Sequence, residues 1–90
     1  MDLVLIKKDS KEWNYIWNWL AEHPLNEDIE EPQVALNDGY MWEYMGSFKH
    51  NDNVITQFRH RHHIKTNRLE ELMLSHKDFD IDSIEKSFKL

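Results

Sequence analysis

The sequence predicts a small α+β domain, and three observations lead to this fold class. A tryptophan-rich segment near the N-terminus repeats its apolar residues at helical spacing. A short apolar run precedes that segment, and two runs of strand-forming residues separated by turn formers follow it. Ninety residues suit one domain with a small core, so we treat 1–90 as a single domain.

The N-terminal part predicts a strand followed by a helix. Residues 3–8 contain a short apolar run and should form a strand. A helix is expected over 10–22, with Asp9 as its N-cap and Glu12 completing the capping-box spacing. The helix should end before Pro24, because the residue before a proline avoids helical geometry. Its core face is predicted to carry Trp13, Ile16, Trp17 and Leu20.

Two strands of an antiparallel hairpin are expected next, over 40–48 and 54–64. We expect Phe48 to lie opposite Val54, because this register gives each face a coherent composition. The face toward the core then carries Trp42, Tyr44, Phe48, Val54, Phe58 and Ile64. The N-terminal strand and this hairpin, near 40–64, together form the predicted antiparallel sheet.

One or two short C-terminal helices complete the predicted fold. Asn67 can cap the first, with Glu70 at the capping-box position. Its inward side chains should be Leu69, Leu72 and Met73. Asp82 can cap a second helix close to the C-terminus.

Composition excludes several classes of protein. Without cysteine, neither a disulfide framework nor a thiolate zinc site can form. The N-terminal apolar run is too short for a signal peptide or a membrane span, so we expect a cytoplasmic protein without a membrane partner. No cofactor motif or catalytic spacing is visible, so we expect no cofactor and no enzymatic activity. The bias toward Ile, Asn and Lys resembles that of small accessory proteins from low-GC bacteria and their phages.

Charge is distributed unevenly along the chain, whose net charge is −6. Between Lys11 and Lys49 there are eight acids and no Lys or Arg, whereas 54–69 holds four cations and no acid. All three arginines fall between positions 59 and 68, although lysine is the commoner cation elsewhere. Clustered arginine indicates a use for the planar guanidinium group, which binds carboxylate or phosphate through two donors.

The strongest candidate site is this basic segment. In an extended strand, Arg59, Arg61 and His63 point to one face, and Glu43 lies opposite Arg59 in the expected register. Lys65 and Arg68 follow where the strand should meet the N-terminus of a helix, a suitable place for an anion. The residues expected to bind are thus Arg59, Arg61, His63, Lys65 and Arg68.

These residues favour a non-enzymatic binding or regulatory protein that docks on a macromolecular partner. RNA or a protein–RNA complex is the preferred partner, because arginines bind the phosphate backbone. The alternative interpretation is an edge strand that charge keeps soluble.

A second hypothesis is a protein-only inhibitor or adaptor, such as a phage protein that binds a host protein. Tyr15 and Trp19 are spaced to form an aromatic pair beside the core face of the helix. The acidic connector could add a surface for a basic partner, through Glu27, Asp28, Glu30 and Glu31. The same connector could instead fold back and cover the aromatic pair.

A third hypothesis is a metal-dependent hydrolase. His60 and His62 are two residues apart in a predicted strand, so both could face one ion. Alternatively, these two histidines are half-buried and hydrogen-bonded under the hairpin.

Overall fold

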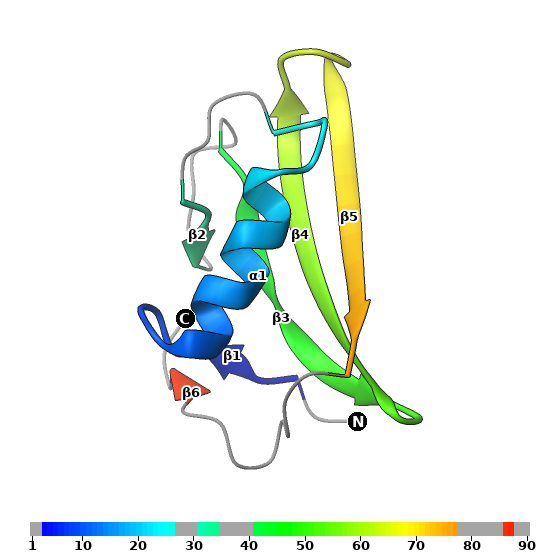
Figure 1. Ribbon diagram of the computed structural model, residues 1–90. Coiled ribbons are helices and arrows are strands. Elements are labelled where there is room, and N and C mark those ends of the chain that lie inside the picture. Colours follow the sequence, from blue (N-terminus) through cyan, green and yellow to red (C-terminus); the bar gives the residue numbers. More distant parts are fainter. Residues whose placement is uncertain (1–2, 27–30, 35–40, 78–85, 88–90) are drawn as a thin grey trace.

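One helix lies across one face of an antiparallel sheet in the computed structural model of the chain (Figure 1). The structure describes residues 3–26, 31–34, 41–77 and 86–87. Their elements are β1 (Leu5–Ile6), α1 (Lys11–Ala21), β2 (Gln33–Val34), β3 (Glu43–His50), β4 (Asn53–His63), β5 (Arg68–His76) and β6 (Lys86–Ser87). The expected α+β class and the tryptophan-rich N-terminal helix are therefore confirmed.

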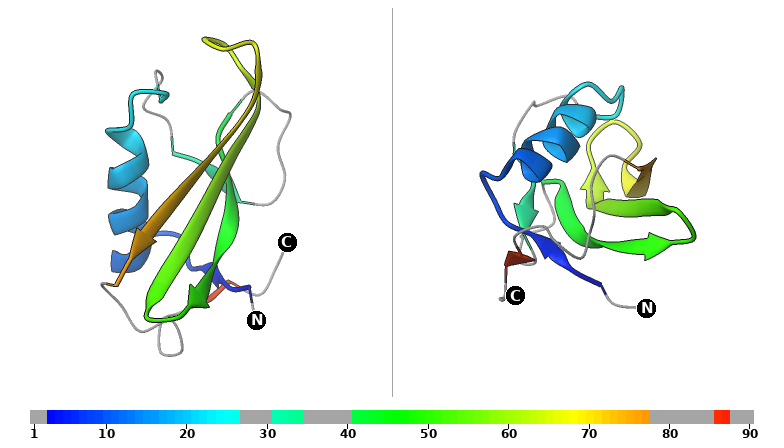
Figure 2. Two further views of the ribbon diagram at one scale, coloured as in Figure 1. Left: turned by 90° about the vertical axis from the view of Figure 1, so that its right-hand side faces the viewer. Right: turned by 60° about the horizontal axis from the view of Figure 1, so that its bottom comes forward.

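The main sheet has the strand order β2-β3-β4-β5, in which β3, β4 and β5 are antiparallel and β2 is parallel to β3. The N-terminal strand β1 pairs with β6 and joins the main sheet through one bridge, between Val4 and Ser47. Figure 2 shows α1 on one face of β3, β4 and β5. We call this the inner face of the sheet and the opposite one the outer face.

Helix α1 begins one residue later than its expected cap implies. Ser10 is the N-cap, and its Oγ accepts the backbone N–H of Trp13 at 3.1 Å. Asp9 instead adopts a positive φ of 72° in the turn before the helix. The expected core face is confirmed for the fully buried Trp13, Ile16 and Leu20, whereas Trp17 is only partly buried.

The β3–β4 register follows the prediction at one end and departs from it at the other. Glu43 lies opposite Arg59, as expected. A bulge at Gly46, where φ is 113°, then adds one residue to β3, so Phe48 lies opposite Ile55. Because one extra residue exchanges the two faces of a strand, Phe48 turns to the outer face. Its predicted place in the core is wrong.

The predicted second helix is also wrong, because residues 68–76 form strand β5. Asn67 caps nothing: it has a positive φ of 57° in the turn between β4 and β5, and its N–H donates to the carbonyl of His63 at 2.7 Å. Leu72 is partly buried against the core, while Leu69 and Met73 are exposed. The helix expected after Asp82 lies mostly outside the described residues, whose last two form β6.

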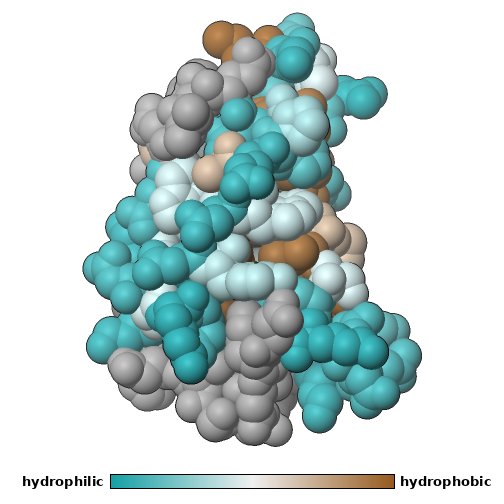
Figure 3. Space-filling model, in the orientation of Figure 1, coloured by the Kyte–Doolittle hydropathy of each residue, from teal (hydrophilic) through white to brown (hydrophobic). Residues whose placement is uncertain are grey.

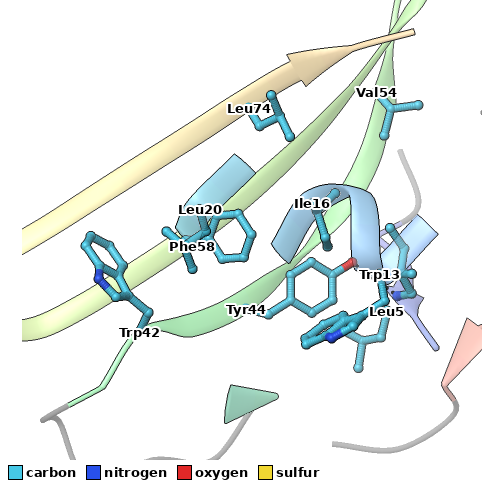
Figure 4. Close-up of a cluster of buried hydrophobic side chains, with 10 residues drawn as sticks. Leu5, Trp13, Ile16, Leu20, Trp42, Tyr44, Val54, Phe58 and Leu74 are labelled. Carbon is cyan, nitrogen blue, oxygen red and sulfur yellow. Dashed lines mark hydrogen bonds between the residues drawn. The ribbon is translucent and has the colours of Figure 1, made fainter. Parts of the chain in front are cut away.

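The core lies between α1 and the inner face of the sheet (Figure 4). The Trp13 and Tyr44 rings meet edge to face at a centroid distance of 5.3 Å. The buried apolar side chains are Leu5, Ile6, Trp13, Ile16, Leu20, Trp42, Tyr44, Val54, Phe58 and Leu74. Ile64, which was also expected there, is 82% exposed in the β4–β5 turn. Within the described residues, no helix is long and apolar enough to span a membrane.

Four buried polar side chains cross the inner face from β3 to β5. The Tyr44 hydroxyl lies 2.8 Å from Ser47 Oγ, which lies 2.8 Å from Thr56 Oγ1. Thr56 Oγ1 is in turn 3.1 Å from His76 Nε2. Tyr44 also accepts the backbone N–H of Ile6 at 3.1 Å, and burial raises its pKa to about 12. We call Tyr44, Ser47, Thr56 and His76 the polar seam.

Candidate partner-binding surface

The five residues expected to bind do not form one continuous face. Two of the arginines lie on the outer face of the sheet, the histidine points inward, and the remaining two cations lie at the end of the β4–β5 hairpin. The expected anion site at a helix N-terminus is not formed, because β5 follows the turn.

Glu43 holds the two outer-face arginines. Its carboxylate accepts Arg59 Nε at 2.9 Å, Arg61 Nε at 3.2 Å and Arg61 Nη2 at 3.4 Å. The Glu43 side chain is 1% exposed, against 31% for Arg59 and 44% for Arg61. Burial by itself raises the pKa of Glu43, but hydrogen bonds and charge from both arginines outweigh it and lower that pKa. Much of the binding capacity of these arginines is therefore satisfied within the fold.

His63 connects the β4–β5 turn to the loop after α1. A bulge between His60 and His63 turns the His63 ring inward, where the residue is 3% exposed, so it does not share the arginine face. Its Nδ1 accepts the backbone N–H of Lys65 at 3.1 Å. The proton of a neutral ring then resides on Nε2, which donates to the carbonyl of Leu25. The N–H of Leu25 donates to His23 Nδ1 at 3.1 Å, and burial lowers the pKa of His23.

The end of the β4–β5 hairpin combines exposed apolar and cationic side chains. Ile64 is 82% exposed and Leu69 50% exposed. Lys65 is exposed beside them, and the Arg68 side chain is 75% exposed. We call Arg61, Ile64, Lys65, Arg68 and Leu69 the hairpin tip. In Figure 3, hydrophobic and hydrophilic surfaces meet at the top of the molecule, where Figure 1 places this turn.

Glu70 lies next to the hairpin tip and binds one of its cations. Arg68 Nε donates to Glu70 Oε2 at 3.0 Å, and this hydrogen bond lowers the pKa of Glu70. The Glu70 side chain is 16% exposed, but that of Arg68 is 75% exposed and water screens the pair. The Arg68 guanidinium can therefore exchange this carboxylate for another anion.

The structure does not bring His60 and His62 to one face. His60 is buried, with its ring 5.4 Å from that of Trp42, whereas His62 is exposed because the bulge in β4 follows His60. Among the described residues, no group of three or more histidine and acidic side chains could hold a metal ion. The geometry therefore supplies no metal site at this pair.

The aromatic pair of α1 is divided between core and surface. Trp19 is partly buried and stacks on Phe58, with ring centroids 6.0 Å apart and planes 15° apart. Tyr15 is 40% exposed, and its ring lies 5.3 Å from that of His76. Trp19 thus contributes to packing, and of this pair Tyr15 is the more exposed ring.

Glu31 is the acidic-connector residue that the structure describes. Its Oε2 accepts the indole N–H of Trp13 at 2.5 Å, and its Oε1 lies 3.6 Å from Lys8 Nζ. It therefore supports the core through the buried indole. The other three acids of the proposed surface, Glu27, Asp28 and Glu30, lie outside the described residues.

Sequence reasoning missed the exposed apolar part of the hairpin tip. Ile64 was assigned to the core and Leu69 to the inner side of a helix. The signal that could have corrected both is Asn67, since asparagine tolerates the positive φ of a tight turn. No family model, curated protein or solved structure matches the chain, so no relative indicates what this surface binds.

Proposed function

We propose that the protein is a small, non-enzymatic binding protein that docks on a partner protein through the hairpin tip. The observation that carries this proposal is Ile64, which is 82% exposed in an ordered turn and has cationic neighbours. Such a surface fits an apolar pocket with an acidic rim. The apolar contact would supply affinity, while the charges would orient the encounter.

The turn that carries Ile64 is held in place before any partner arrives. Within it, Asn67 N–H donates to the His63 carbonyl at 2.7 Å, and Lys65 N–H donates to His63 Nδ1 at 3.1 Å. The His63 ring is itself attached to the loop after α1 through the carbonyl of Leu25. A turn organised in this way loses less conformational entropy on binding, which favours a role in recognition.

RNA is the second candidate, because Arg61, Lys65 and Arg68 expose three cations at one end of the molecule. Two features favour a protein partner over RNA. The hairpin tip carries no Phe, Tyr or Trp, the large rings on which bases stack, and an aliphatic side chain gains nothing from phosphate. Arg61 also shares the Glu43 carboxylate with Arg59, which reduces the positive field.

Affinity capture from cell lysate tests the proposal, using the whole chain as bait. The test variants are Ile64→Ser and the pair Lys65→Ser with Arg68→Ser. The matched controls are Leu3→Ser, which alters another exposed apolar residue at 57% exposure, and Lys49→Ser, which removes an exposed lysine far from the turn. Each bait is used with and without nuclease treatment.

A protein partner should be captured by the wild type and by both controls, and should survive nuclease. It should be lost with Ile64→Ser and reduced with the double cation variant. Loss of all capture after nuclease, with Ile64→Ser still active, would replace the proposal by RNA binding. Capture that no tip variant alters would show that the hairpin tip is not the binding surface.

A further inference from the structure

Strand β5 forms one margin of the main sheet. In the part of the chain that the structure describes, β5 is hydrogen-bonded to β4 and to no other strand. The pairing with β4 is uninterrupted from Glu70 to His76, so this part of β5 is regular. Figure 1 shows β5 at the margin, with α1 over the sheet rather than beside the strand. No other described strand pairs with its second edge, whose backbone N–H and C=O groups are those that a further strand would use.

The usual devices that prevent edge pairing are missing from the C-terminal part of β5. Between Leu72 and His76 the strand has no proline, no lysine and no bulge. Apolar side chains flank the edge on both faces. Met73 is 59% exposed on the outer face, and Leu72 is partly buried on the inner face. A regular edge with these side chains is a template for another strand.

We propose that the occupant of this edge is β5 of a second copy of the chain. The two strands pair antiparallel about a two-fold axis that passes midway between Leu72 of one copy and Leu72 of the other. Such an axis is perpendicular to the sheet, so each residue lies opposite a residue of the same face. In every available register, one residue of β5 therefore lies opposite the same residue of the second copy. The charges that face each other and the number of paired residues decide between these registers.

Centring the axis on Glu70 or on Glu71 places two identical carboxylates directly opposite each other, which is unfavourable. Centring it on Leu72 pairs all nine residues of the strand and removes both clashes. In this register Glu71 lies opposite Met73 of the second copy. Centring on Met73 also avoids the acids but leaves the first two residues of β5 unpaired.

The assembly would join two sheets into one continuous sheet, with an α1 helix from each copy on the same side. Because the two β5 strands run in opposite directions, the two hairpin tips would lie at opposite ends. The pairing includes Arg68 and Leu69 of the hairpin tip, but Ile64 and Lys65 lie outside β5. Its test at Met73 is therefore distinct from the test of the proposed function at Ile64.

Sedimentation equilibrium of the wild type over micromolar to submillimolar concentrations measures the association. The register-specific variants are Met73→Glu and Met73→Lys. In each of the two symmetric pairs, Met73→Glu places an acid opposite Glu71 of the other copy, and Met73→Lys places a cation there. Asn14→Glu and Asn14→Lys make the same charge changes at an exposed position on α1 and serve as matched controls. Thermal melts by circular dichroism establish that each variant is folded.

We expect a monomer–dimer equilibrium that Met73→Glu weakens roughly tenfold, because two like-charge pairs are created. Met73→Lys should tighten it by a similar factor, and Glu71→Lys combined with Met73→Glu should restore it. A wild type that remains monomeric throughout overturns the proposal without any variant. Equal weakening by Met73→Glu and Met73→Lys, or no effect of either, overturns the Leu72-centred pairing.

Discussion

Replacing Glu43 with glutamine removes the charge that Arg59 and Arg61 share, while the shape of the side chain is kept. In the wild type the 1% exposed carboxylate accepts hydrogen bonds at 2.9, 3.2 and 3.4 Å. Glutamine keeps one acceptor oxygen but directs an amide group, which is a donor, at the guanidinium donors. At least one of the hydrogen bonds is therefore lost, together with the attraction between opposite charges.

The cost is expected to be about 2 kcal/mol in the free energy of unfolding. A hydrogen bond to a charged group contributes about 1.5–3 kcal/mol net. We take a value in the lower half of this range because Arg59 is 31% and Arg61 44% exposed, so water can hydrate both once the carboxylate is gone. For a domain of this size, about 2 kcal/mol corresponds to a decrease in Tm of roughly 8–16 °C.

Urea unfolding followed by circular dichroism, at pH 7 and at successive values down to pH 3, measures this difference. The arginines hold the pKa of Glu43 below its ordinary value, so the folded state binds a proton less readily than the unfolded state. The contribution of Glu43 to stability is therefore complete above the ordinary glutamate pKa of about 4.3. It is lost as pH falls through the lower pKa of the folded state, so the two proteins should converge in acid.

Glu71→Gln is the matched control, because Glu71 is an exposed acid opposite Arg59 on the neighbouring strand. We expect it to change stability by no more than about 0.5 kcal/mol. Equal stabilities of wild type and Glu43→Gln at pH 7 would refute the reasoning. So would a difference that stays constant down to pH 3.

Trp13→Ala should lower the free energy of unfolding by about 3–5 kcal/mol, whereas Trp17→Ala should cost clearly less, because Trp17 is only partly buried; urea titrations compare the two. Gly46→Ala should destabilise by about 1–3 kcal/mol, since φ is 113° and a Cβ would lie 2.8 Å from Leu3 Cγ. Adding Leu3→Ala should relieve the contact but not the backbone strain, so only part of the Tm is recovered. In a spectrophotometric titration the Tyr44 phenol should ionise only near pH 12, and ionisation near pH 10 would contradict its burial. A chelator should leave Tm unchanged, whereas a marked decrease would reveal a bound metal.

The parts of the fold that depend on local periodicity could be predicted from the sequence. The spacing of Trp13, Ile16 and Leu20 determines which side of α1 is buried, and the structure confirms it. The pairing of Glu43 with Arg59 also follows from alternation along two strands. This contact could therefore be predicted from the sequence pattern.

Features decided by long-range pairing could not be predicted in this way. The bulge at Gly46 shifts the register by one residue. A glycine inside a strand can mark a bulge, but only the pairing with β4 decides whether one forms there. Asn67 and Glu70 have the spacing of a helix cap, but asparagine is equally suited to a turn with positive φ. Hydrogen bonding of β5 to β4 decides between these two structures. The exposure of Ile64 then follows from the turn.

The polar seam has a consequence for how β3, β4 and β5 are coupled. Each hydroxyl in it can donate only one proton, so a hydroxyl that donates to one neighbour must accept from the other. If His76 Nε2 is an acceptor, Thr56 donates to it and every hydroxyl donates toward β5. If Nε2 carries the proton, this constraint is removed, the row can reverse, and the Tyr44 hydroxyl can donate to the carbonyl of Val4, 3.4 Å away. An acceptor Nε2 on β5 thereby fixes the orientation of three hydroxyl dipoles on β3 and β4, without displacing any backbone atom.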